Sequence, residues 1–257
     1  MNDGIYSPIG VSVSLSLEPI ADMPALLMKE RRTWVCVADL HIGIEVQLRL
    51  GGFNIPSQTP RMLSSLEELA GHGSKLLILG DLKHRIPSVG YRENREIVPF
   101  MERLGRSFDT VALVSGNHDG GIASILPKSV QAVPGRGTLI ENIGAFHGHV
   151  WPSETVMEAD SIVMGHTHPS VLLVDSLGAK TNEKCWVRAR LDNGVVAQRY
   201  RHCPKELVIV PAFNPLLTGT PVNSKHRSMI GPVFRNGLVD LKSMRIYLLD
   251  GTNLGNL

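Results

Sequence analysis

The sequence predicts an α/β protein, and three features of the chain lead to that expectation. Short apolar runs of strand length recur between residues 34 and 164, and polar clusters with glycine, aspartate or histidine follow them. Segments with the apolar spacing of amphipathic helices lie between several of these runs. From Pro169 onward the chain reads as consecutive strands, so its C-terminal part is expected to be β-rich.

The expected elements follow this pattern in order. An alternating segment over 11–17 predicts a half-buried opening strand. Fully apolar runs predict buried strands at 34–38, 75–79, 111–114, 143–146 and 161–164. Helical spacing predicts helices over 43–50, 60–69 and 92–104, the last with Pro99 in its interior. Later, Asp192-Asn193-Gly194 stands between 185–191 and 195–200 and predicts a β-hairpin there.

Composition excludes several classes of protein. No apolar run approaches the roughly 18 residues that a membrane span needs. A net charge of +2 is well below what a dedicated nucleic-acid binder carries, although a phosphate-bearing substrate remains compatible with it. Three cysteines without CxxC spacing, and a start without a secretory pattern, predict a reducing, cytoplasmic environment and no membrane partner.

The histidines carry the functional signal, because seven of the 10 lie in or beside the polar clusters. Asp39 and His41 follow one strand and Asp81 the next; taken alone, each cluster could be an ordinary turn. Together the clusters supply carboxylate, amide and imidazole groups without thiolate, which suits Mn²⁺, Fe or Zn²⁺. They exceed the needs of one ion, so we expect two cations about 3.5–4 Å apart, which can generate a hydroxide and clamp phosphoryl oxygens.

Five motifs extend this expectation to a family. They resemble, in order, the five blocks of the calcineurin-like metallophosphoesterases: Asp39-x-His41, Gly80-Asp81, Gly116-Asn117-His118-Asp119, His147-Gly148-His149 and Gly165-His166-Thr167-His168. The surroundings of the first two blocks are similar to small prokaryotic phosphoesterases related to SbcD-type nucleases. The 211–219 segment resembles one in the DNA-ligase-associated relatives of that group.

The resemblance implies a four-layer αββα sandwich built as a single domain over 1–257. Its core motifs would span 39–168, and residues 169–257 would be the β-rich completion. It also implies two divalent metal ions, Mn most of all, with Fe, Zn or Ni as alternatives. The residues implied as metal ligands are Asp39, His41 and His168 for the first ion, Asn117, His147 and His166 for the second, and Asp81 as the bridge between them.

Roles in catalysis follow from the same resemblance. His118 would stabilise the transition state or protonate the leaving oxygen, with Asp119 orienting its ring, and His84 would reposition the substrate phosphate. His147 is preferred to His149 as ligand because the family's ligand precedes the glycine. His149 and Lys83 are then expected to bind substrate, although a ligand role for His149 stays open.

The expected activity is phosphodiester hydrolysis by a metal-bridged hydroxide, nuclease-like or on nucleotides. SbcD-type nucleases carry a capping domain that grips duplex DNA; fewer than ninety residues follow His168 here, so short, single-stranded or small substrates are expected instead. Two alternatives remain: a phosphomonoesterase acting on a small metabolite, and a non-catalytic metal-binding partner subunit of a DNA-processing complex. The presence of His118 argues against the second alternative, because a scaffold does not need that residue.

Overall fold

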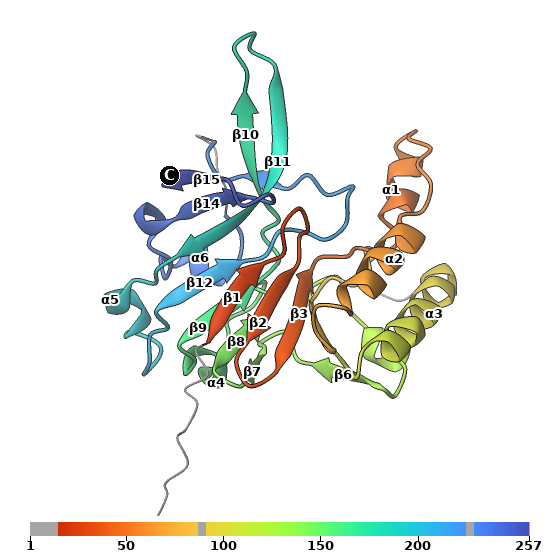
Figure 1. The fold of residues 1–257 in the computed structure, drawn as a ribbon, viewed down its shortest axis with the longest axis horizontal. Coiled ribbons are helices and arrows are strands. Elements are labelled where there is room, and N and C mark those ends of the chain that lie inside the picture. Colours follow the sequence, from red (N-terminus) through yellow and green to blue (C-terminus); the bar gives the residue numbers. More distant parts are fainter. Residues whose placement is uncertain (1–14, 87–90, 225–228, 257) are drawn as a thin grey trace, which may run out of the picture.

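The computed structural model describes residues 15–86, 91–224 and 229–256, with side chains for all of these except 91–94. In this part of the chain the strands form two sheets (Figure 1). The first has the order β1-β2-β3-β4-β5-β6, and β3 to β6 run parallel to one another. Its strands are β1 (Ser16–Pro19), β2 (Leu26–Lys29), β3 (Thr33–Ala38), β4 (Lys75–Leu79), β5 (Thr110–Val114) and β6 (Val130–Val133).

The second sheet has the order β13-β10-β11-β12-β9-β8-β7, and β14 joins it through β11 and also pairs with β15. Within it, β8, β9 and β12 run parallel. Figure 1 shows the ends of β10 and β11 projecting from the molecule. The strands of this second sheet are β7 (Thr138–Ile140), β8 (Ile143–Phe146), β9 (Ser161–Met164), β10 (Pro169–Val174), β11 (Lys180–Ala189), β12 (Glu206–Ile209), β13 (Thr220–Pro221), β14 (Arg245–Leu248) and β15 (Asn253–Asn256).

Helices cover the outer faces of both sheets. Three longer helices belong to the first half of the chain and lie together on one side in Figure 1: α1 (Ile44–Leu50), α2 (Thr59–Leu69) and α3 (Tyr91–Ser107). Shorter ones follow: α4 (Glu154–Met157), α5 (Asn193–Val196), α6 (Pro232–Arg235) and the 3₁₀ turns Ile122–Ser124 and Leu241–Ser243. No helix in the described ranges has the length and apolarity of a membrane span.

Alternating side chains of β4 show how the layers form. Ile78 packs outward with residues of α2 and α3, whereas Leu77 packs inward against the second sheet. The inward cluster unites both sheets, with Ala145 and Val163 contributed by β8 and β9. A third cluster lies between the second sheet and α4, α5 and α6. Helix, sheet, sheet and helix are therefore the four layers that the family resemblance implied.

Most predicted elements occur within a few residues of their expected bounds, because long apolar runs and helical spacing are strong local signals. The opening strand is seen only as β1, since residues 11–14 lie outside the described ranges. The hairpin around Asp192-Asn193-Gly194 was wrong. The Asp192 carboxylate accepts hydrogen bonds from the backbone N–H groups of Gly194 and Val195, so it caps α5 instead of leading into a turn between strands.

Candidate metal centre

The polar clusters meet at one edge of the sandwich because they follow parallel strands. β3, β4 and β5 are neighbours in the first sheet, and β8 and β9 are neighbours in the second. Parallel strands present their carboxyl ends at the same edge of a sheet, which is where sites in open α/β sheets form. The side chains gathered here are Asp39 and His41 after β3, Asp81 after β4, Asn117 and His118 after β5, His147 and His149 after β8, and His166 and His168 after β9.

A first group of donors consists of Asp39, His41, Asp81 and His168. One ligand atom from each residue lies within 4.8 Å of those of the others, close enough for a single cation. His168 Nε2 is 3.3 Å from Asp39 Oδ1, and His41 Nε2 is 3.4 Å from Asp81 Oδ2. This is the set of residues expected around the first ion and its bridge.

A second group shares Asp81 with the first and adds His147 and His166, again within 4.8 Å. His147 Nε2 lies 3.4 Å from Asp81 Oδ2 and 3.3 Å from Asn117 Oδ1. The same carboxylate oxygen of Asp81 therefore lies at equal distance from a histidine of each group. His149 is in neither group, which favours His147 as the donor on this strand.

Two of the donor side chains are oriented by a hydrogen bond at a second polar atom of the same side chain. Asp39 Oδ2 accepts a hydrogen bond from the His166 backbone N–H, and the Nδ1–H of His147 donates to the Leu79 carbonyl. Such partners fix the orientation and the tautomer of a metal-binding side chain. Among the described residues, Asp39 Oδ1, His41 Nε2 and His168 Nε2 are buried without a hydrogen-bond partner. A buried polar atom without a partner is costly, and a cation would satisfy all three, so these residues fit a divalent metal.

Backbone conformation marks the same place. Seven non-glycine residues in the described chain have positive φ, and five of them are predicted metal ligands. Those five are Asp39 (57°), His41 (42°), Asp81 (49°), His166 (68°) and His168 (43°). Left-handed backbone costs free energy for these residue types and concentrates at functional sites, where surrounding contacts enforce it.

Two positions require glycine because atoms of donor residues lie too close to leave room for a Cβ. A Cβ on Gly80, which has φ +75°, would lie 2.3 Å from His147 Nδ1. A Cβ on Gly116 would lie 2.1 Å from Asp81 Oδ1. Both distances are far inside van der Waals contact, so side chains at these positions would displace two of the central donors.

Electrostatics keep most of the donors in their metal-binding forms. Burial lowers the pKa of His41 to about 3 and that of His166 to about 4, which leaves both imidazoles neutral. Burial would raise the pKa of Asp39 and of Asp81, but neighbouring histidines outweigh it and hold both carboxyls below their usual range. Burial opposes protonation of His147, yet Asp81 and Asp39 raise its pKa to about 9, so a cation there would displace a proton.

His118 is half-buried at the rim of the centre, 4.7 Å between ring centroids from His41. Asp119 was expected to orient its ring, and the structure shows a different partner: Nδ1–H of His118 donates to the backbone carbonyl of His84. The Asp119 carboxylate instead accepts from the backbone N–H groups of Gly116 and Lys83. Its position in the turn aims it at those amides, so it shapes the loop that carries His118.

The three residues expected to contact substrate lie in different settings. His84 is half-buried against His41 and His118, and its Nε2 meets Gln47 of α1, a contact that no sequence signal predicted. Lys83 is completely buried, and its ammonium group donates to the Arg85 carbonyl, which corrects its expected role in substrate binding. His149 lies beside His147 and His166, with its Nδ1 buried and unbonded in the described chain.

The chain is similar to one protein family and to several solved structures. The sequence model of the calcineurin-like phosphoesterase family matches residues 33–150. The nuclease MPE from Pseudomonas putida is 19% identical, with a TM-score of 0.55 over 93% of this chain and 100% of that one. Yfce, a phosphoesterase from E. coli, is 17% identical, with a TM-score of 0.39 over 87% of this chain and 97% of that one. No curated protein matches the sequence.

The likeness to the nuclease MPE shows a shared fold, and the family match covers the blocks that end β3, β4, β5 and β8. These are the strands whose ends carry most of the two donor groups. Residues 33–150 therefore match the calcineurin-like phosphoesterase family, a class of hydrolases that act on phosphoric esters.

Proposed function

We propose that this protein is a dinuclear phosphodiesterase that works in the cytoplasm and uses Mn²⁺. Fe, Zn and Ni are the alternative ions. We place it with the small SbcD-related phosphoesterases of the DNA-ligase-associated type, and we propose that residues 1–257 act as one domain. The hydrophobic cluster shared by the two sheets supports the single domain. Oxygen and imidazole donors without thiolate support the choice of metal.

The observation that carries the proposal is the position of Asp81. Its Oδ2 lies 3.4 Å from His41 Nε2 and 3.4 Å from His147 Nε2, so one carboxylate belongs to both donor groups. A shared carboxylate between two histidine-containing groups is what a bridged pair of cations requires. When bound, such a pair supplies Lewis-acid activation of water and neutralises charge on the phosphoryl oxygens.

A pocket next to the centre favours a diester over a monoester. It has a volume of about 390 Å³, and the residues that line it include His149, His166, Trp151, Arg235 and Asn236. A monoester needs room for one esterified group, whereas a diester needs room on both sides of the phosphorus. We take this pocket as the space for the second esterified group, with the positive charge of Arg235 beside it.

His118 and His84 are the side chains that we assign to proton transfer and phosphate binding. Because Nδ1–H of His118 is used by the His84 carbonyl, its Nε2 is the atom that can hold a proton for the leaving oxygen. His84 lies between His118 and Gln47, at the rim of the first donor group. Its ring nitrogens contact His41 Nδ1 and Gln47 Oε1, so we propose that Nε2 exchanges Gln47 for a phosphate oxygen when substrate binds.

The first test compares hydrolysis of bis(p-nitrophenyl) phosphate with that of p-nitrophenyl phosphate, with added Mn²⁺ and after chelation. His118→Ala is expected to lose at least about 10²-fold in kcat, the usual contribution of a general acid. His72→Ala is the matched control, since His72 is an exposed histidine outside the centre. Single-stranded and duplex oligonucleotides then test whether the diester is a nucleic acid.

Each outcome separates the candidate functions. Metal-dependent preference for the diester, lost in His118→Ala and kept in His72→Ala, supports the phosphodiesterase. A preference for the monoester supports a phosphatase acting on a small metabolite. Binding of metal without cleavage of either ester or of oligonucleotides would refute the enzyme and support the non-catalytic partner subunit.

A further inference from the structure

A segment after β12 runs alongside the turn that carries Asp39 and His41. Ala212 forms a parallel bridge with Ala38, and the Phe213 backbone N–H donates to the Ala38 carbonyl at 2.7 Å. Asn214 is completely buried and 174 residues distant in sequence from Leu40. Its side-chain amide donates to the Leu40 carbonyl at 2.7 Å and approaches the His41 carbonyl at 3.4 Å.

The turn needs such support because both of its ligand residues are left-handed, with φ of 57° for Asp39 and 42° for His41. On one flank it is bonded to the Asp81 loop, through the His41 N–H and the Asp81 carbonyl at 2.8 Å. That loop carries a metal ligand itself, so it offers no independent support. On the other flank Asn214 is the side chain that reaches two consecutive carbonyls of the turn.

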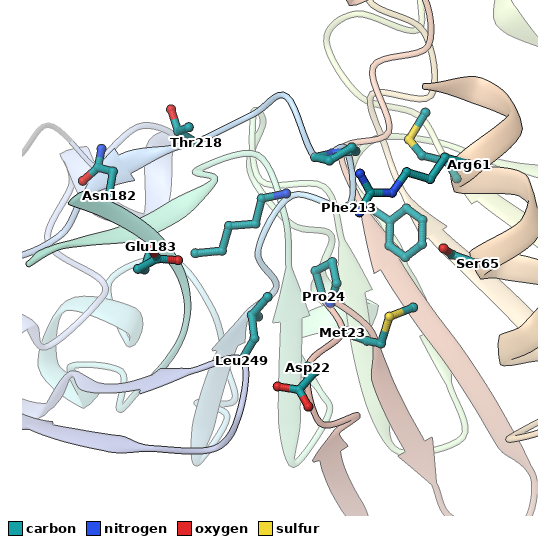
Figure 2. A pocket seen from close by; sticks show the side chains of 13 residues that line it. Asp22, Met23, Pro24, Arg61, Ser65, Asn182, Glu183, Phe213, Thr218 and Leu249 are labelled. Carbon is teal, nitrogen blue, oxygen red and sulfur yellow. The ribbon is translucent and has the colours of Figure 1, made fainter. Parts of the chain in front are cut away.

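Lys184 of β11 holds this segment in turn. Its ammonium group donates to the Ala212 and Asn214 carbonyls, both at 2.6 Å, and so brackets Phe213. Short bonds from an ionised donor are the stronger kind. Figure 2 shows Phe213 beside Arg61 and Ser65 of α2, at the wall of a pocket of about 360 Å³ that Lys184 also lines. Phe213 belongs to the cluster between the first sheet and its helices, which anchors the segment.

We propose that Asn214 and Lys184 are positioning residues for the first metal ion. Asn214 holds the backbone of the Asp39–His41 turn, and Lys184 holds Asn214. The inference rests on the proposed metal centre and assigns no contact with substrate to either residue. It gives a role to part of the 211–219 segment, which neither donor group includes. Outer partners of metal ligands commonly control affinity about 10- to 100-fold.

The experiment measures Mn²⁺ binding by titration calorimetry and unfolding of the metal-free protein by thermal melting. The variants are Asn214→Ala, which removes the amide, and Lys184→Met, which keeps the stem of the side chain and removes the ammonium group. Asn223→Ala is the matched control, because the Asn223 side chain likewise bonds backbone groups, the N–H and the carbonyl of Leu172, and belongs to neither donor group. Hydrolysis of bis(p-nitrophenyl) phosphate is recorded for the same proteins.

Asn214→Ala should weaken binding of one Mn²⁺ ion about 10-fold or more and leave the other site close to its wild-type affinity. Lys184→Met should weaken the same site, by less. Asn223→Ala should lower the melting temperature without changing either affinity. If Asn214→Ala does not fold, Lys184→Met alone decides the matter.

Affinities within about twofold of wild type in the folded variants would overturn the proposal, and so would equal weakening of both sites. A wild-type protein that binds two Mn²⁺ ions but cleaves no diester would refute the proposed function and leave this inference standing. A wild-type protein that binds no Mn²⁺ would overturn both.

Discussion

Replacement of Gly116 by alanine tests the centre at its tightest point. The added Cβ would lie 2.1 Å from Asp81 Oδ1 and 2.4 Å from the Asp81 backbone nitrogen, whereas ordinary contacts begin at 3.4 Å. Relief therefore needs a shift of about 1 Å, the scale at which catalytic groups lose alignment. Asp81 cannot move alone, because its carbonyl binds the His41 N–H and its Oδ1 binds the His118 N–H.

The expected magnitude follows from that displacement. A shift of about 1 Å in a group that both donor sets share should lower kcat/KM about 10²-fold. Forcing a methyl group into packed surroundings should also reduce the free energy of unfolding by about 1–3 kcal/mol. In a protein of this size each kcal/mol lowers the melting temperature by roughly 2–4 °C, so the variant should remain folded at room temperature.

The assay is hydrolysis of bis(p-nitrophenyl) phosphate at saturating Mn²⁺, together with calorimetric Mn²⁺ binding and a melting curve. Gly71→Ala is the control, since a Cβ there meets its nearest atom, the Glu68 carbonyl oxygen, at 3.4 Å. If the activity of Gly116→Ala lies within about threefold of the wild-type activity, the reasoning is refuted, because Asp81 would then tolerate a displacement of about 1 Å.

Three further predictions test other parts of the structure. Asp81→Asn should weaken binding of both Mn²⁺ ions by calorimetry, because its Oδ2 lies 3.4 Å from a histidine of each donor group; weakening of one alone would exclude a bridge. Leu77→Ala, in the cluster between the sheets, should cost about 2–5 kcal/mol in denaturant unfolding, and a loss below about 1 kcal/mol would contradict the packing described. Burial raises the pKa of Cys36 well above its usual range and that of Cys185 to about 12, so neither forms thiolate at neutral pH. Half-buried Cys203 should therefore react first with a disulfide reagent in the native protein, and rapid labelling of Cys36 would argue against the fold.

The donors could be predicted because each directly follows an apolar run that is unmistakably a strand. Leu76 to Leu79 are all buried, as a strand covered on both faces requires, and Asp81 comes two residues later. Because β3 and β4 are parallel neighbours, their ends meet, so the gathering of Asp39 and Asp81 follows from the strand pattern alone. His147 follows a strand of the second sheet and joins them only through the packing of the two sheets. Local pattern was sufficient for the composition of the site.

Side-chain direction could not be read from the same pattern. Lys83 was expected to bind substrate and is buried, because the bridge between Ile42 and Lys83 continues the pairing of β3 and β4 past their ends. Asp119 follows His118 directly but bonds the amides of Gly116 and Lys83. Asp-Asn-Gly at 192–194 suits a hairpin and a helix cap alike, and contacts of α5 with the rest of the fold decide between them.

The contacts across the two sheets explain why the centre lies where it does. Asp39 and Asp81 belong to the first sheet and His147 and His166 to the second, so each donor group joins both. The same residues also bond across this boundary, His147 to the Leu79 carbonyl and the His166 amide to Asp39, and the partners are 68 and 127 positions apart in the sequence. Distances between donors therefore depend on how the sheets pack, through residues such as Leu77 and Val163. Metal affinity and the packing between the sheets should accordingly be coupled, because a cation binds only the arrangement in which both sheets are in place.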